Sequence, residues 1–226
     1  MTQADQVNLA VVREKLYTAV IGDIMDMMGL IHQFLPPAIR ALRPEDKLVG
    51  RAMPVLEADC ATDRVSHDPG EDAFGRMFDA LDSLQGDEVY ICTGSSPRYA
   101  LWGELMNARA GTLGAAGAVV DGFHRDTLGI LKQKLPLFSH GSYAQDQRVR
   151  GRVIDYRCPI EFGNATRVMP GDLIVGDVDG VVVVPAAREA EVIEAALEKV
   201  AGENRVFEMI LSGRSTRGIF DETGIM

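Results

Sequence analysis

The sequence predicts an α/β protein, and three observations carry that prediction. Helical and extended apolar patterns alternate through the chain as far as Pro136. Beyond Pro136 the pattern changes to several short apolar strands separated by turn residues. A long amphipathic helix is then expected from about residue 187 to 212, with acidic residues in its first turn and Gly213 behind it. This pattern is typical of mixed sheets with flanking helices.

The chain is expected to begin with two short helices between residues 8 and 29, since apolar residues recur there at helical spacing. Thr18 is expected to cap the second helix and Gly29 to end it. An extended stretch at residues 49–58 follows a proline-rich turn. After a polar loop, a helix is predicted within residues 71–84.

The middle of the chain predicts a βαβα unit. Its elements are a strand at 87–94, a helix at 101–114, a strand at 115–122 and a last helical element at 126–133. In such units ligands gather where strand ends meet helix starts. We therefore expect Gly94 to Glu104 and Gly122 to Asp126 to share one edge of the sheet.

The C-terminal half is expected to be mostly β structure. Asp179-Gly180 is a two-residue hairpin signal. The surrounding "GDVDG", residues 176–180, has some likeness to a calcium loop, but it lacks the later glycine and glutamate, so a hairpin is favoured. No linker interrupts the chain, which predicts a single domain over residues 1–226. The tail after Gly213 is expected to be peripheral or used in assembly.

Composition excludes several classes of function. A net charge of −10 and a pI near 4.9 argue against a nucleic-acid or anionic-membrane surface, which would need a basic patch. The three cysteines stand far apart and suggest neither a zinc site nor a disulfide framework. No apolar run is long enough to cross a bilayer and no signal peptide is evident, so a cytoplasmic protein is expected.

Arg125 and Asp126 form the first candidate site, directly after a predicted buried strand. One interpretation is structural, with both residues solvated or Arg125 in an ion pair. The other is functional. An aspartate is a hard oxygen ligand suited to Mg²⁺ or Mn²⁺, and an arginine can bind a carboxylate through two parallel hydrogen bonds. Together the two side chains could hold a metal and an organic acid side by side.

The segment Gly103-Glu104-Leu105-Met106 is the second candidate. If a helix starts here, its first amides have no intrahelical partners and can bind a carboxylate. Glu104 either favours the helix dipole only or completes a metal site through water. His124 and His140 are candidate acid/base groups, although an isolated histidine is more often simply packed or solvent-facing.

These motifs resemble those of the RraA-like family. The likeness lies in "WGELMNARAGTLGAAGAVVDGFHRD" (102–126) and "PGDLIVGDVDGVVVVP" (170–185), and extends to "TAVIGDIMDMMG" and "LVGRAMPV". That family includes class II pyruvate aldolases acting on 4-hydroxy-4-methyl-2-oxoglutarate and 4-carboxy-4-hydroxy-2-oxoadipate, as well as the ribonuclease E inhibitor that gives it its name. The resemblance implies a three-layer β/β/α fold of the swivelling-domain type, assembled as trimers and often hexamers.

The resemblance also implies a site. Asp126 would be the direct ligand of Mg²⁺ or Mn²⁺, and Glu104 would hold water on that metal. Arg125 would contact the keto-acid end of the substrate, and the amides from Gly103 to Met106 its carboxylate. A glutamate from a neighbouring subunit would complete the site, for which Glu203 is our choice and Glu198 the reserve.

The activity expected from this set is metal-dependent cleavage of a C–C bond. The substrate would be a 4-hydroxy-2-oxo acid that releases pyruvate, or oxaloacetate that is decarboxylated. Two alternatives stay open: a non-enzymatic ring that regulates a ribonuclease by protein interaction, and another metal-dependent lyase or isomerase step on sugar-derived acids. Retention of Glu104, Arg125 and Asp126 favours an enzyme, since a binding protein has no need of them around one pocket.

Overall fold

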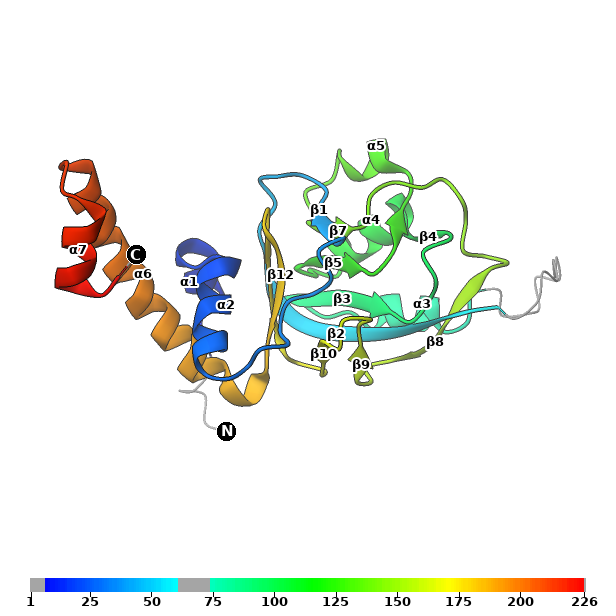
Figure 1. The fold of residues 1–226 in the computed structure, drawn as a ribbon. Coiled ribbons are helices and arrows are strands. Elements are labelled where there is room, and N and C mark those ends of the chain that lie inside the picture. Colours follow the sequence, from blue (N-terminus) through cyan, green and yellow to red (C-terminus); the bar gives the residue numbers. More distant parts are fainter. Residues whose placement is uncertain (1–6, 61–73, 226) are drawn as a thin grey trace.

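The computed structural model describes residues 7–60 and 74–225 (Figure 1). Its helices are α1 (Leu9–Lys15), α2 (Thr18–Met27), α3 (Met77–Asp82), α4 (Glu104–Thr112), α5 (Thr127–Ile130), a 3-10 turn (Ala186–Arg188), α6 (Glu189–Leu211) and α7 (Thr216–Thr223). Its strands are β1 (Arg40–Ala41), β2 (Leu48–Asp59), β3 (Glu88–Thr93), β4 (Ala100–Trp102), β5 (Gly117–Val120), β6 (Phe123–His124), β7 (Leu137–Ser139), β8 (Gly151–Tyr156), β9 (Ile160–Glu161), β10 (Arg167–Val168), β11 (Leu173–Asp177) and β12 (Gly180–Val184).

An eight-stranded mixed sheet forms the centre, in the order β1-β7-β5-β3-β2-β11-β12, with β8 also paired to β2. The neighbours β2, β3, β5 and β7 are parallel, and the remaining pairs are antiparallel. Two smaller sheets, β9–β10 and β4–β6, accompany it. Strands β3 and β5 are buried on both faces, which is why they consist of unbroken apolar runs. The predicted α/β class and βαβα unit are confirmed.

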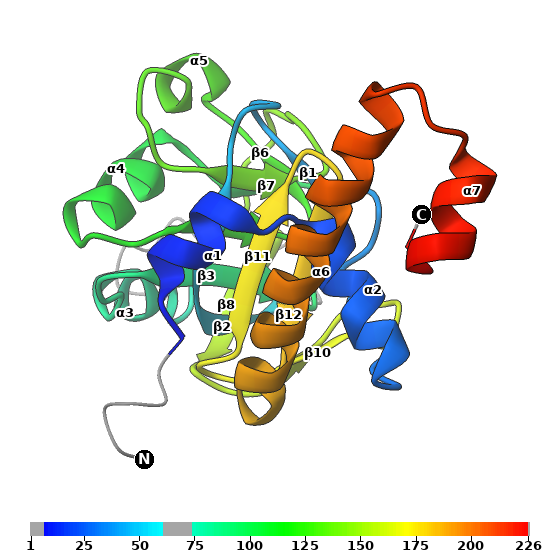
Figure 2. The same cartoon turned by 90° about the vertical axis from the view of Figure 1, so that its left-hand side faces the viewer.

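Helices from the two ends of the chain cover the β11–β12 end of the sheet. Figure 2 shows α6 running along this hairpin with α1 and α2 beside it. Apolar residues of the three helices form one core with β2, β11 and β12. Its fully buried members include Leu16, Ile21, Met25, Val175 and Val182. A second core lies under α3 and α4, around Tyr90, Trp102 and Ala110.

The start of α2 differs from the prediction, because Thr18 is the first helical residue and Tyr17 occupies the cap position. The cap comes from a distant residue. Asp177 at the end of β11 accepts hydrogen bonds from the Thr18 amide at 2.8 Å and from its hydroxyl at 2.7 Å. Gly29 follows the helix in a left-handed conformation, φ +78°, as a helix-ending glycine does.

The predicted hairpin exists, but its turn lies one residue earlier than expected. Asp177 pairs with Gly180, so Val178 and Asp179 form the turn and Gly180 begins β12. The Asp179 amide donates to the Asp177 carboxylate at 3.0 Å, which favours this register. Two other predicted elements are shorter than expected. Helix α3 covers only 77–82 of the expected 71–84, of which 71–73 lie outside the described residues, and residues 101 and 102, expected in the next helix, belong to β4 instead.

Strand β2 contains a buried carboxyl group. Glu57 follows an irregularity between Leu56 and Glu57 in the pairing with β8, and its side chain is turned into the protein, 2% exposed. Gln147 donates to its Oε2 at 2.6 Å, while Oε1 has no partner among the described residues. Burial raises the pKa of Glu57 from 4.5 to about 8, against the effect of the Gln147 bond. The folded protein therefore holds this carboxyl protonated at neutral pH.

No helix in the described segments could span a membrane.

Replacement of Glu57 by glutamine should flatten the dependence of stability on pH. Between pH 4.5 and about 8 the folded state keeps a proton that the unfolded chain releases. The free energy of unfolding therefore falls as the pH rises, by up to about 1.4 kcal/mol per pH unit. In Glu57→Gln this loss should disappear, as measured by denaturant unfolding at pH 5 and pH 8. Equal pH dependence in both proteins would contradict the assignment; Glu161→Gln, at an exposed site, is the control.

Candidate active site

Pairing between β4 and β6 brings the two predicted loops together. The strands run parallel, with Ala100 opposite Phe123 and Trp102 opposite His124. The Arg125 amide continues this pairing by donating to the Trp102 carbonyl at 2.9 Å. Helices α4 and α5 start directly after the two strands, and both lie at the same side of the molecule in Figure 1. The expectation that both loops share one sheet edge is therefore confirmed.

Asp126 points back at the start of α4. It has a left-handed backbone, φ +59° and ψ +33°, and occupies the cap position of α5. Aspartate tolerates this conformation better than most residues. Its Oδ2 lies 3.4 Å from the amide of Glu104, which donates to it. At Gly103 a Cβ atom would lie 2.9 Å from the same oxygen, so a glycine there keeps room for the carboxylate.

The Arg125 guanidinium lies between two carboxylates. Its Nε is 3.7 Å from Asp126 Oδ2 and its Nη1 is 3.3 Å from Asp146 Oδ1. The three side chains are between 36% and 46% exposed, so solvent and small molecules can reach them. A hollow of about 360 Å³ opens beside them. It is lined by Arg125, Asp126, Thr127, Ser142, Tyr143 and Ala144.

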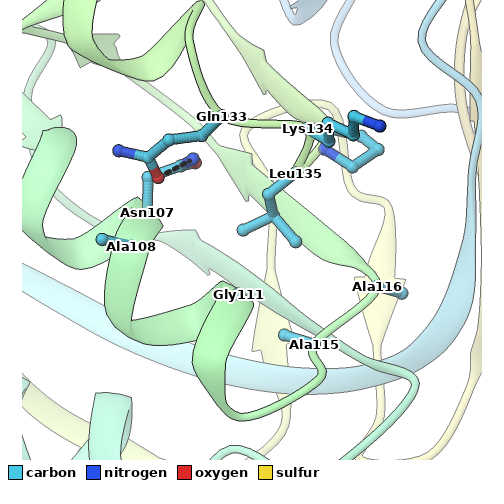
Figure 3. Close-up of a pocket in the computed structure, with 9 residues that line it drawn as sticks. Asn107, Ala108, Gly111, Ala115, Ala116, Gln133, Lys134 and Leu135 are labelled. Carbon is cyan, nitrogen blue, oxygen red and sulfur yellow. Dashed lines mark hydrogen bonds between the residues drawn. The ribbon is translucent and has the colours of Figure 1, made fainter.

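Glu104 lies in the first turn of α4, and its carboxylate rests on α5. A Cβ atom at Gly129 would lie 2.2 Å from Glu104 Oε2, so the carboxylate occupies the space that a larger side chain would fill. The Gln133 amide group donates to the Glu104 carbonyl at 3.3 Å and accepts from Asn107 at 2.9 Å. Figure 3 shows Asn107 and Gln133 joined in this way at a neighbouring hollow. These bonds tie α4 to the segment after α5.

The start of α4 retains donors for an anion. Its first intrahelical bond runs from the Asn107 amide to the Gly103 carbonyl at 3.0 Å, so the amides of Leu105 and Met106 precede the helical ladder. The Glu104 amide is already used by Asp126. Of the amides expected to bind a carboxylate, Leu105 and Met106 are therefore the better placed. Leu105 exposes its side chain, whereas Met106 packs against the core.

The donor set suits only one kind of metal site. The described part of the chain holds no group of three or more Asp, Glu, His and Cys side chains that could enclose a metal. A closed zinc-type site is thus not built from these residues. Mg²⁺ usually keeps several waters and takes one or two carboxylates. Asp126, half exposed and next to Glu104, fits that requirement.

The histidines of this region do not face Arg125. His124 is buried on β6, its Nδ1 lies 2.8 Å from Ser139 Oγ, and burial lowers its pKa. His140 is 3.1 Å from Asp121, which also accepts a 2.6 Å bond from Thr93. Both histidines line an adjacent hollow rather than the one lined by Arg125 and Asp126. The suggested proton-transfer role of His124 gains no geometric support.

Glu203 lies away from the hollow within its own chain. It is on α6, where it accepts a 2.5 Å hydrogen bond from Tyr17 and lies 3.7 Å from Lys199. The bond to Glu203 is the main reason that the pKa of Tyr17 is raised to about 12. Glu198 is exposed on the same helix. Neither glutamate contributes to the site within one chain, so a role for either requires a second copy.

Residues 18–183 match the model of the protein family described as RraA-like, Aldolase/RraA. The chain belongs to the RraA-like family. A relative from Halalkalibacterium halodurans, named "Putative 4-hydroxy-4-methyl-2-oxoglutarate aldolase", is 31% identical over 186 residues, which are 82% of this chain and 80% of the relative.

Solved structures agree with this membership. An uncharacterized protein from Pseudomonas syringae pv. tomato has a TM-score of 0.78 and 29% identity, over 93% of this chain and 95% of that one. RraAS2 from Streptomyces coelicolor, described as an unusual member of the RNase ES inhibitor RraA family, has a TM-score of 0.75 at 22% identity, over 89% and 97% of the chains. The RraA-like fold implied by the sequence is thus confirmed.

Gly129→Ala should displace the Glu104 carboxylate while leaving the fold intact. The added methyl would meet the far end of the exposed Glu104 side chain rather than backbone, and alanine favours a helix more than glycine does. If Glu104 takes part in the reaction, turnover should fall about 10- to 100-fold, because small misplacements of reacting groups are costly. Steady-state kinetics and thermal unfolding measure both effects. Unchanged turnover would show that the position of Glu104 is unimportant; Gly111→Ala, in open space on α4, is the control.

Proposed function

We propose that this protein is a divalent-metal-dependent lyase that cleaves a C–C bond of a 4-hydroxy-2-oxo acid and releases pyruvate. One observation carries the proposal: the ion-paired Arg125 and Asp126 lie at the start of α4, where Asp126 contacts the Glu104 amide and the next two amides precede the helical ladder. A cation, a metal-binding carboxylate and a carboxylate-binding helix start are the groups that an oxo acid requires. The name of the Halalkalibacterium relative supports the same substrate class.

Binding of the substrate follows from these groups. The amides of Leu105 and Met106 would hold the carboxylate at the pyruvyl end, aided by the positive end of the α4 dipole. Arg125 would direct its N–H groups at the 2-oxo oxygen and that carboxylate. Asp126 would hold Mg²⁺ or Mn²⁺, with Glu104 nearby. When bound, the metal would act as a Lewis acid on the 2-oxo group.

In the retro-aldol direction the 4-hydroxyl group would give its proton to a water held by Glu104 and become a carbonyl as the C3–C4 bond breaks. The bonding electrons move into the pyruvate fragment as an enolate, whose charge on oxygen Arg125 would stabilise. A proton then returns to C3, and a water held by Glu104 is the carrier we favour. Oxaloacetate would follow the same course, with carbon dioxide leaving in place of the aldehyde or ketone.

We further propose that the working form is a homotrimer or a pair of trimers. The C-terminal part of α6 and the whole of α7 extend away from the sheet in Figure 1. These helices expose Phe207, Leu211 and Phe220, which are 58%, 66% and 48% accessible. Apolar side chains gathered on projecting helices favour contact with another protein surface. A second copy could in this way supply the glutamate expected at the site, Glu203.

Arg125→Ala and Asp126→Ala should each lower kcat/KM for 4-hydroxy-2-oxo acids by at least about 100-fold, because the first removes the cation that would stabilise the enolate and the second removes the carboxylate that would hold the metal. Arg125→Lys should recover little, since a point charge does not reproduce a planar two-pronged contact. Pyruvate release measures the effect, and unfolding and sedimentation report folding and assembly. Near-full activity in either alanine variant would refute the site. Arg167→Ala, which breaks an exposed ion pair on β10, is the matched control.

Removal of divalent metal should abolish pyruvate release, and added Mg²⁺ or Mn²⁺ should restore it. The physical reason is that the 2-oxo group needs a Lewis acid to store the electrons of the broken bond. The assay compares oxaloacetate and 4-hydroxy-4-methyl-2-oxoglutarate with and without EDTA. Activity that EDTA leaves unchanged would contradict metal dependence. No turnover of any oxo acid would favour a regulatory binding role instead.

A further inference from the structure

We propose that Asp146 is a positioning residue that sets the orientation of the Arg125 guanidinium toward the substrate. The consequence of this positioning for oxo-acid binding rests on the function proposed above. The effect of Asp146 on the Arg125 side chain does not depend on that function. No motif in the sequence points to Asp146, which lies twenty-one residues after Arg125 in a segment without regular structure. Three features of Asp146 support this role: its contact with Arg125, the hydrogen bonds of its backbone and the sign of its charge.

The Arg125 guanidinium forms ion pairs with carboxylates at two of its ends. Arg125 Nη1 is 3.3 Å from Asp146 Oδ1, while Nε is 3.7 Å from Asp126 Oδ2. Asp126 therefore lies at the Nε end of the planar group and Asp146 at an Nη end. Carboxylates at two different ends of a guanidinium favour one orientation of its plane, which gives the remaining N–H groups a preferred direction. Asp146 thus supplies the second of the two ion pairs that orient the plane of the guanidinium.

The backbone of Asp146 is firmly held on both sides. The preceding carbonyl, of Gln145, accepts a bond from the Ala100 amide on β4 at 2.8 Å. Asp146 itself forms a bridge with Ala100, and its carbonyl accepts from Arg150 Nη1 at 2.9 Å. Because β4 also pairs with β6, which precedes Arg125, the two charged residues lie on segments that are both paired with β4. Their separation is therefore set by main-chain hydrogen bonds.

The next residue anchors this segment in the interior. Gln147 is buried and donates its side-chain amide to Glu57 Oε2 at 2.6 Å. Its carbonyl accepts from the amides of Arg150 at 2.7 Å and Gly151 at 3.0 Å. A chain of contacts thus runs from Glu57 in the core, through Gln147 and Asp146, to Arg125 at the surface. Support of this kind is what holds a binding side chain in place.

The charge of Asp146 distinguishes positioning from a neutral surface ion pair. A carboxylate next to Arg125 weakens its attraction for an anionic substrate, so on charge alone the removal of Asp146 would tighten binding. If Asp146 orients the guanidinium, its removal weakens binding instead, since fewer N–H groups meet the anion. The two accounts predict changes of opposite sign. An exposed ion pair with no further role would change little in either direction.

The test compares Asp146→Ala and Asp146→Asn with the wild-type protein. In crystal structures, Arg125 should leave its wild-type orientation in Asp146→Ala and keep it in Asp146→Asn, which retains an acceptor oxygen. The Kd of oxalate in the presence of Mg²⁺ should rise about tenfold or more in the alanine variant, the range for loss of a supporting contact, and stay within about threefold in the asparagine variant. KM should change more than kcat.

Asp155→Ala is the matched control, because it breaks another Arg–Asp pair of comparable exposure, with Arg76, away from the hollow. The inference is wrong if Arg125 keeps its orientation in Asp146→Ala, or if the Kd of oxalate is unchanged or lower. If wild-type protein neither binds oxalate nor cleaves an oxo acid, the proposed function fails. The orientation of Arg125 in Asp146→Ala then still decides the inference.

Discussion

The candidate site depends on one short parallel pairing, that of β4 with β6. Gly103 and Glu104 follow the three-residue strand β4, and Arg125 and Asp126 follow the two-residue strand β6. The Arg125 amide bonded to the Trp102 carbonyl extends the pairing to the point where the side chains meet. The proposed binding of a metal and an oxo acid depends on this juxtaposition. Loss of the pairing would leave a free helix start and an isolated ion pair.

The candidate site must bind an anionic substrate although the protein as a whole is negatively charged. The chain carries a net charge of −10, and Arg125 itself lies next to two carboxylates. Anion binding can therefore not rest on the overall field; it needs the α4 dipole and a group that neutralises Asp126. A divalent cation would do so, which gives an electrostatic reason, independent of resemblance, for the metal in the proposed mechanism. The buried Glu57 avoids adding to the negative charge by remaining protonated at neutral pH.

Sequence reasoning located the parts of the fold that follow local rules. The βαβα unit came from apolar periodicity, and the meeting of Arg125 with the α4 start came from the rule that parallel strands share an edge. Features set by contacts between distant residues could not be read in this way. Asp177 caps α2 from a position 159 residues later in the chain, β4 and β6 are too short to show a period, and Asp146 carries no local pattern. The turn before Gly180 was misplaced by one residue for the same reason, since an Asp177 contact sets its register.

The central claim is that one place on the protein binds both a divalent cation and the carboxylate end of an oxo acid. Diffraction from crystals soaked with Mn²⁺ and oxalate, a stable mimic of the pyruvate enolate, tests it most directly, because anomalous scattering identifies the metal. The account predicts an anomalous peak against the Asp126 carboxylate, with oxalate between that peak, Arg125 and the amides of Leu105 and Met106. A peak elsewhere, or oxalate bound away from Arg125, would contradict it.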